Sequence, residues 1–260
     1  MLRIFSLLTL LSTIFMADSN AQRWSLGMGT GFSQYVGDIR DESAGAMLRP
    51  TASFGFHYKT TGRLHWSFNT SITSLKATDA NTDNKSRGLS FNTTLAELSV
   101  LARVDLRKGK RITPYLTAGT ALFFVDPWAE AANGDKVKLY PLSTGGQGLT
   151  QYPDVKEHSK ANISLPFGGG FDFALAKGIH LEMDVILRKT FTDYIDDLGS
   201  VYPDRAALSA ARGTQAVSYA WRGSGAYPAA GSVRGDADDK DWYSSFNLRL
   251  KIPMGKTKGK

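Results

Sequence analysis

The chain has 260 residues, 42% of them apolar and 11% aromatic, and carries a formal net charge of +7. This length fits one large domain or two small ones, and the basic balance suits nucleic acid, anionic lipid or an acidic protein as partner. The chain contains no cysteine, which excludes disulfides, zinc–thiolate sites and iron–sulfur clusters.

The first 21 residues have the pattern of a secretory signal peptide. Arg3 precedes an apolar run from Ile4 to Met16, and small and polar residues follow it as far as Ala21. The run is about 13 residues long, which is short for a helix that crosses a bilayer. We therefore expect residues 1–21 to be a cleaved signal and residues 22–260 to be a single exported domain. An N-terminal membrane anchor is the alternative.

Apolar and polar residues alternate along much of the mature sequence. In residues 23–35, Trp24, Leu26, Met28 and Phe32 share one face, while glycine and serine occupy much of the other. A period of two residues indicates β-strands with one apolar face. The predicted strands cover residues 23–35, 49–59, 63–74, 95–107, 113–124, 161–175, 179–191 and 241–253.

The connections between these strands alternate between short and long. The short ones are "KTTGR", "RKGKR" and "AKGI", whereas the long ones cover about 36–48, 77–88, 125–160 and 195–240. Long antiparallel strands, even in number and joined in this way, are typical of outer-membrane proteins. We predict an all-β fold: an eight-stranded antiparallel transmembrane β-barrel with short periplasmic turns, long extracellular loops and both termini in the periplasm.

This fold assigns a different environment to each face of a strand. Apolar side chains such as Leu248 are expected to meet lipid, and polar ones such as Asn247 to face the lumen. The interior of an eight-stranded barrel is about filled by side chains, so we expect a packed polar network and not a pore. The alternative is a soluble periplasmic β-sandwich or lipocalin-like barrel, which would bury the apolar face inside.

The segment "RKTFTDYIDDLGSVYPD", residues 188–204, lies where the seventh predicted strand ends. We expect its aromatic residues Phe191 and Tyr194 at the level of the lipid headgroups and its acids in water at the base of a loop. The acids lack the ligand spacing of an EF-hand loop, so no calcium site is predicted. The four histidines form no H-x-x-x-H pair, so no other metal site is predicted either; they are His57, His65, His158 and His180.

Residues 65–67, "HWS", are the strongest catalytic candidate. A histidine two residues before a serine resembles the pair in outer-membrane lipid A deacylases, where the histidine activates the serine for attack on an ester. His65 and Ser67 are predicted to face the lumen, however, whereas Trp66 faces lipid. The pair also follows the predicted periplasmic turn at Gly62, while lipid A lies in the outer leaflet. We therefore predict no catalytic residue, no cofactor and no enzymatic activity.

Basic residues gather at the predicted periplasmic edge. "RKGKR" has four cations in five residues, and Asp105 is the one acid expected near this edge. The cations could meet phospholipid headgroups of the inner leaflet or dock an acidic periplasmic protein, and the sequence favours neither. The residues assigned to this partner-binding rim are Lys59, Arg63, Arg107, Lys108, Lys110, Arg111 and Lys177.

Six motifs occur in order along the mature chain: "QYVGDI", "RITPYLTAGTALFF", "LYPLSTGGQG", "LPFGGG", "TFTDYIDDLGSVY" and "DWY". Together they resemble the PorG-like outer-membrane barrels of Bacteroidota, which are components of the type IX secretion system. The resemblance covers essentially the whole mature chain, although "TPYLTAG" alone fits many eight-stranded barrels of the OmpW type. The Ala/Gly/Ser-rich region 206–234 departs from it, so any role of that loop stays open.

The resemblance implies a non-enzymatic outer-membrane subunit of the type IX secretion and gliding machinery, which links a periplasmic ring to the outer membrane. It also implies periplasmic ring proteins and outer-membrane lipid as partners, with no small-molecule substrate. Nucleic acid is not expected as a partner, because the chain is predicted to be exported. The alternatives are a stand-alone OmpW-like barrel for small-molecule passage and a lipid-modifying outer-membrane enzyme.

Overall fold

The computed structural model describes residues 23–39, 47–107, 110–155, 157, 159–176, 178–199, 201–236 and 240–255. The predicted signal peptide, residues 1–21, lies outside these ranges. Strands are β1 (Trp24–Val36), β2 (Arg49–Lys59), β3 (Leu64–Thr78), β4 (Ser90–Asp105), β5 (Ile112–Phe124), β6 (Trp128–Glu130), β7 (Lys136–Lys138), β8 (Ala161–Ala176), β9 (Ile179–Thr190) and β10 (Trp242–Pro253). The helix α2 covers Arg205–Ala220, and the short 3₁₀ turns are η2 (Asp79–Asn81), η3 (Lys85–Arg87) and η4 (Tyr140–Leu142).

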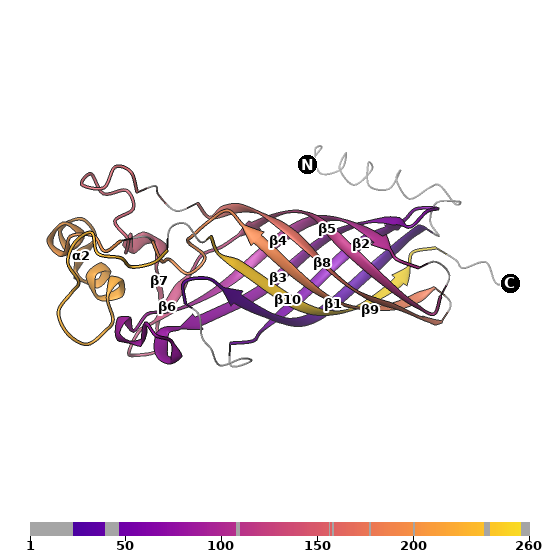
Figure 1. The fold of residues 1–260 in the computed structure, drawn as a ribbon, viewed down its shortest axis with the longest axis horizontal. Coiled ribbons are helices and arrows are strands. Elements are labelled where there is room, and N and C mark those ends of the chain that lie inside the picture. The colour runs from indigo at the N-terminus through magenta and orange to yellow at the C-terminus, as the bar shows by residue number, and fades with distance from the viewer. Residues whose placement is uncertain are drawn as a thin grey trace, which may run out of the picture.

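Eight of the ten strands form a closed antiparallel barrel (Figure 1). Neighbours follow the order β1-β2-β3-β4-β5-β8-β9-β10, and the pairing of β1 with β10 closes the ring. Each barrel strand therefore has a hydrogen-bonded neighbour on both sides, which is the condition for a sheet to cross a bilayer. The predicted eight-stranded barrel is confirmed, and the two further strands, β6 and β7, form a hairpin beyond its rim.

The apolar face of the barrel points outward, as predicted. Leu248 is 39% exposed, whereas the adjacent Asn247 is 6% exposed and faces the lumen. The same parity places large apolar side chains such as Met28, Ile72 and Leu98 on the outer surface of other strands. A soluble sandwich or lipocalin-like barrel would bury these side chains, so the structure excludes that alternative. No helix in the described ranges is long and apolar enough to cross a membrane.

The two ends of the barrel differ (Figure 1). At one end, β1 begins, β10 ends, and short turns connect β2 to β3, β4 to β5 and β8 to β9. This end is called the short-turn end. The other, the long-loop end, carries α2, the β6–β7 hairpin and the 3₁₀ turns.

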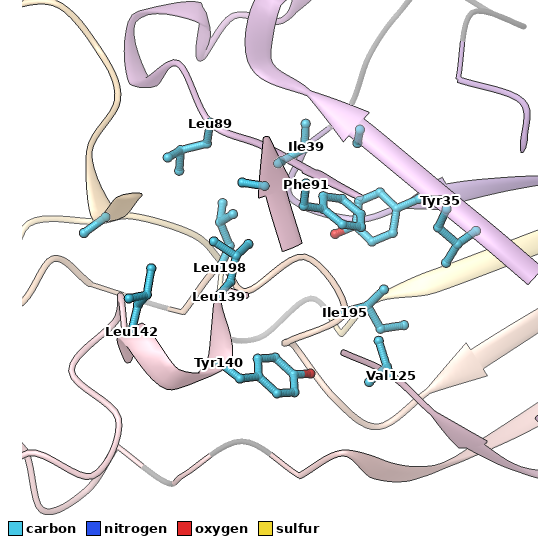
Figure 2. Packing of buried hydrophobic residues seen from close by; sticks show 14 of the residues in the cluster. Tyr35, Ile39, Leu89, Phe91, Val125, Leu139, Tyr140, Leu142, Ile195 and Leu198 are labelled. Carbon is cyan, nitrogen blue, oxygen red and sulfur yellow. The ribbon is translucent and has the colours of Figure 1, made fainter. Parts of the chain in front are cut away.

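The long-loop end is a folded cap and not a set of open loops. Its core contains Phe91, Leu139, Ile195 and Leu198, which come from three separate segments of the chain (Figure 2). Helix α2 buries Leu208 against this core. The cap therefore has its own apolar interior outside the barrel, which the alternating sequence pattern did not predict.

Strands β3 and β4 extend into this cap, and there their apolar side chains point inward and their polar side chains outward. Inside the cap, the inward side chains Leu75, Phe91 and Leu95 are apolar and buried, while Lys76 and Thr94 point away from the core. This is the reverse of the barrel wall, where apolar side chains point outward. The pattern reverses because these strand ends have left lipid for water, and so β4 begins at Ser90 instead of the predicted residue 95.

Candidate functional site

The lumen is filled by ion pairs that cross from one strand to another. Toward the short-turn end the carboxylate of Glu182, on β9, pairs with Arg103 of β4 and with two cations of β10. Arg249 Nη1 lies 2.9 Å and Lys251 Nζ 2.6 Å from the two carboxylate oxygens. Glycine in the wall makes room for these long side chains. At Gly27 an added Cβ would lie 2.3 Å from His57 Nε2, so a larger residue would displace that imidazole.

A second layer of polar contacts lies nearer the long-loop end. Arg188 Nε donates to Glu97 Oε2 at 2.7 Å, and Tyr115 Oη donates to Asp184 Oδ2 at 2.8 Å. Asn247 Nδ2 donates to the other oxygen of Asp184 at 2.7 Å. These groups are buried and hydrogen-bonded, so the structure confirms the predicted packed polar lumen. Removing one member of a buried ion pair leaves its partner uncompensated and costs about 3–5 kcal/mol.

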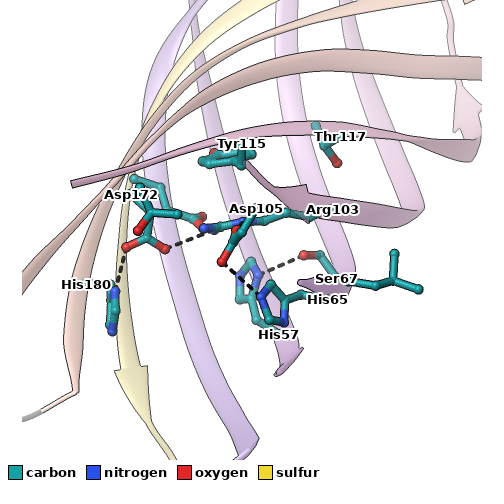
Figure 3. A network of polar contacts seen from close by, with 12 residues as sticks. His57, His65, Ser67, Arg103, Asp105, Tyr115, Thr117, Asp172 and His180 are labelled. Carbon is teal, nitrogen blue, oxygen red and sulfur yellow. Dashed lines mark hydrogen bonds and ion pairs between the residues drawn. The ribbon is translucent and has the colours of Figure 1, made fainter. Parts of the chain in front are cut away.

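A cavity of about 510 Å³ opens at the short-turn end of the lumen, and it is called the mouth cavity. His65 Nε2 lies 3.0 Å from Asp105 Oδ2, and Arg103 Nε donates to the other oxygen of that carboxylate at 2.7 Å (Figure 3). Across the cavity His180 Nδ1 lies 2.5 Å from Asp172 Oδ1. Asp105 was predicted to be the one acid near this edge, and that prediction is wrong. Asp172 and Glu182 also lie there, because the strands that carry them face Arg103 across the lumen.

The structure places five of the seven predicted rim residues, all exposed, at the end of β2 and on the short turns. These five have no carboxylate partner within the described residues. The other two, Lys108 and Lys177, lie outside the described residues. The role of the rim in binding a partner stays a prediction. The five placed residues are Lys59, Arg63, Arg107, Lys110 and Arg111.

The H-x-S motif does not form a catalytic pair at the lipid surface. Ser67 and His65 are buried and face the lumen, as predicted, while Trp66 is 39% exposed on the outer wall. Ser67 Oγ lies 3.0 Å from Nδ1 of His57, not from His65 (Figure 3). His57 Nε2 has no hydrogen-bond partner in the described part of the chain, so the group that would orient this imidazole as a base is missing there. The contact between His57 and Ser67 was not predicted, because it depends on the β2–β3 register.

Among the described residues no three His, Asp or Glu side chains are arranged to hold a metal ion.

The acids of residues 193–197 are buried in the cap, so the prediction that they lie in water is wrong. Asp196 is 2% exposed, and Asp193 and Asp197 are also buried. The chain turns inward after β9, and Asp196 Oδ1 accepts a hydrogen bond from the backbone N–H of Leu198 at 2.8 Å. Phe191 alone follows the prediction, with 59% of its surface exposed on the outside of the wall.

One tyrosine hydroxyl joins two of the buried acids. Tyr35 Oη lies 2.7 Å from Asp196 Oδ2 and 2.5 Å from Asp241 Oδ1. A hydroxyl carries one hydrogen, so it can donate to one carboxyl while it accepts from the other only if that other is protonated. Burial raises the pKa of both carboxyls, and repulsion from Asp196 raises that of Asp241 further. The raised pKa values and the position of the hydroxyl together favour a proton on this pair of carboxyls.

Arginine residues tie the cap segments together. Nε and Nη2 of Arg87 each donate to the carboxylate of Asp79 at 2.8 Å, and its Nη1 donates to the carbonyl of Arg234 at 2.5 Å. Arg234 in turn donates to the carbonyl of Asp197 at 2.7 Å. These contacts link the β3–β4 connection to the segments on either side of α2, which gives the cap a defined shape.

The fold has likenesses among solved structures. Neisserial surface protein A aligns with 88% of this chain and 96% of its own, at 10% identity and a TM-score of 0.45. A major outer membrane protein from Thermus thermophilus aligns with 88% of this chain and 99% of its own, at 10% identity and a TM-score of 0.44. Ail, the attachment invasion locus protein of Yersinia pestis, aligns with 88% of this chain and 95% of its own, at 11% identity and a TM-score of 0.39.

No curated protein matches the sequence. The model of one family matches residues 3–139, which is more than half of the chain. The family is described as a domain of unknown function, DUF6089. On this match, the chain belongs to the DUF6089 family.

Proposed function

We propose that this protein is a non-enzymatic outer-membrane barrel that anchors a protein secretion machine, as a subunit of the type IX secretion and gliding system. In this proposal the protein belongs to a Gram-negative bacterium, and the signal peptide at residues 1–21 directs its export. The short-turn end faces the periplasm with both termini, and it binds periplasmic ring proteins. The cap faces outward.

One observation carries the proposal: the lumen is filled, and cations without a carboxylate partner among the described residues gather at one rim. Glu182 holds three cations in the lumen, and removing any of these buried charges would leave the others uncompensated. A barrel plugged in this way is poorly suited to passing small molecules. Its surfaces, and not its interior, are then the parts available for function.

The outer wall and the rim suit an anchor. Exposed apolar side chains cover the wall, which fixes the barrel in a bilayer. The exposed cations of the short turns stand beside that apolar belt in water, where they can attract an acidic partner. The same geometry disfavours a lipid-modifying enzyme, because Ser67 faces the lumen and Trp66 faces the lipid.

The motifs behind the resemblance also support the proposal. Tyr35 belongs to "QYVGDI", Asp196 to "TFTDYIDDLGSVY" and Asp241 to "DWY", and these three residues meet in one hydrogen-bonded cluster. Residues that are 161 and 206 positions apart in the chain thus depend on one another. Three of the six motifs therefore contribute to one structural unit.

The test is capture of the native protein from cells in a gentle detergent, with identification of bound proteins by mass spectrometry. We expect periplasmic ring proteins to copurify, and deletion of the gene to stop secretion of cargo. Sugar-dependent swelling of liposomes that contain the pure protein, together with normal cargo secretion in the deletion strain, would instead support small-molecule passage.

A further inference from the structure

The mouth cavity has more positive than negative charge on its walls. Five lysine and arginine residues line it against two aspartates. Arg103 and Lys251 are paired with the carboxylates of the lumen. The remaining three cations have no carboxylate partner in the ranges that the structure describes, and they stand at the entrance: Lys59, Lys110 and Arg111.

Two buried imidazoles in the same wall have a nitrogen without a partner. His57 Nε2 and His65 Nδ1 make no hydrogen bond to any described residue, although the two residues are only 9% and 8% exposed. Neither nitrogen is exposed to the cavity, so the two rings lie beside its contents and do not bond them directly. The charge excess of the cavity indicates an anionic ligand, and the two imidazoles in its wall are close enough to report on one.

The position of the cavity distinguishes between sources of such a ligand. The side chains that line it are inward-facing, whereas Leu64 and Trp66 of the same strand point out toward lipid. A lipid headgroup at the outer wall therefore faces the wrong side of the sheet. A peptide in the periplasm can enter along the barrel axis. The volume of about 510 Å³ is within the range of sites for small ligands or a few side chains.

The chain's own C-terminus is a poor occupant on charge. β10 ends at Pro253, which lines the cavity, so the residues that follow it begin at the entrance. Their sequence includes Lys256, Lys258 and Lys260 and no acid. A cationic segment would be repelled by a cationic mouth.

We propose that the mouth cavity receives an acidic segment of a periplasmic partner, whose Asp or Glu carboxylates pair with Lys59, Lys110 and Arg111. This inference rests on the proposed anchoring function and adds the chemistry of the contact. Under it, the partner inserts a short stretch of chain into the barrel and does not only lie against the rim. The cations that line the cavity then matter more than equally exposed cations beside it.

The turns offer a matched pair of variants for the test. Lys110→Ser with Arg111→Ser removes two charges from the cavity wall, and Arg63→Ser with Arg107→Ser removes two exposed charges that do not line it. The probe is a fluorescein-labelled peptide of six glutamates, and the barrel is kept in uncharged detergent. We expect the first variant to weaken peptide binding about tenfold, which corresponds to about 1.4 kcal/mol, and the second by less than about threefold. Equal losses in both variants would overturn insertion.

Imidazole NMR signals give a second readout that contact with the rim alone would not move. Addition of the peptide should shift the ring nitrogen signals of His57 and His65 in the wild type. Unchanged signals at saturating peptide would overturn the inference, even if both variants fold and the peptide binds. Vesicles of phosphatidylglycerol serve as the lipid probe. If the two variants differ in vesicle binding and not in peptide affinity, the mouth serves lipid and the inference fails.

The experiments can overturn the mouth site and the proposed secretion function separately. If native capture yields ring proteins but the peptide neither binds nor shifts the imidazoles, the anchor stands and the acidic segment is overturned. If the peptide binds as expected while deletion of the gene leaves cargo secretion normal, the mouth site stands and the secretion role is overturned.

Discussion

The shared proton between Asp196 and Asp241 predicts that the cap loosens as pH rises. Asp196 is 2% and Asp241 1% exposed, and a single tyrosine hydroxyl stands between them. While one carboxyl is protonated, the Tyr35 hydroxyl can accept a hydrogen bond from that carboxyl and donate one to the ionised carboxylate. Once both are ionised, two buried negative charges share one hydrogen, and the cap must open to hydrate one of them.

The sign and size of this effect follow from proton linkage. The folded cap holds a proton that the unfolded segment releases at the ordinary aspartate pKa, so the folded state binds more protons above that pH. Its stability is therefore lost as pH rises, by up to about 1.4 kcal/mol per pH unit. The loss begins above about pH 4 and ends at the raised folded pKa of the pair. Between pH 5 and pH 7 it amounts to at most about 2.7 kcal/mol.

Asp241→Asn tests this reasoning, because asparagine imitates the protonated carboxyl. Its amide can donate to Tyr35 Oη, while its oxygen accepts the Ile195 N–H that Asp241 Oδ2 now accepts at 2.9 Å. The assay is the protection of the Ile195 and Leu198 amides from hydrogen exchange at pH 5, 7 and 9, relative to amides of the barrel strands. We expect protection to fall with pH in the wild type and to stay level in the variant. The same slope in both proteins, or no slope in the wild type, would refute the shared proton.

Three further predictions concern the barrel. Leu248→Arg should lower the stability of the folded barrel by about 2–4 kcal/mol and remove the heat-modifiable band on gels. Asn247→Arg, on the lumen side, should have a milder effect, and equal tolerance of the two changes would contradict the face assignment. Glu182→Gln should destabilise the barrel by about 3–5 kcal/mol in urea unfolding, while exposed Glu130→Gln should have little effect. Liposomes that contain the wild type should not swell in small sugars, and rapid swelling would show an open lumen.

The barrel could be predicted from sequence because one rule governs most of it. In a strand the side-chain period is two, so once one residue of a strand is assigned to lipid, every other residue follows. This is why Leu248 and Asn247 were assigned to the correct faces. The rule also explains the error at β4, since Phe91 and Leu95 obey the same period with the inside and outside exchanged. A period alone does not say which solvent a strand end meets.

The cap could not be predicted, because its contacts join distant segments. Asp196 was expected in water on the ground that aspartates in loops are usually hydrated. Its burial depends on Tyr35, which is 161 residues away. Helix α2 was missed because the Ala/Gly/Ser-rich region lacks strong periodicity and contains Gly213, whose φ of 84° interrupts the helix.

The candidate site was predicted in part. The rim cations were found because they lie on turns, whose place at one end of a barrel follows from strand order. The carboxylates that neutralise Arg103 were not assigned to it, because Asp172 and Glu182 lie on strands that do not pair with β4. Contacts across a lumen depend on the shear of the whole barrel, and the alternation within single strands does not define it.

The proposal that the short-turn end holds the secretion partner is most directly tested by capture of that partner with two charge-matched variants. Each variant changes four cations to glutamine, one set at each end of the barrel. The set at the short-turn end is Arg107, Lys108, Lys110 and Arg111. The set at the long-loop end is Lys85, Lys136, Lys160 and Arg205.

Capture is measured at low salt and at 1 M salt, where charges are screened beyond about 3 Å. We predict that both variants insert as folded barrels, that the short-turn variant loses the partner and cargo secretion, and that the long-loop variant keeps both. Wild-type capture should also weaken at 1 M salt. Undiminished capture by the short-turn variant in low and high salt would contradict the anchoring role of this end.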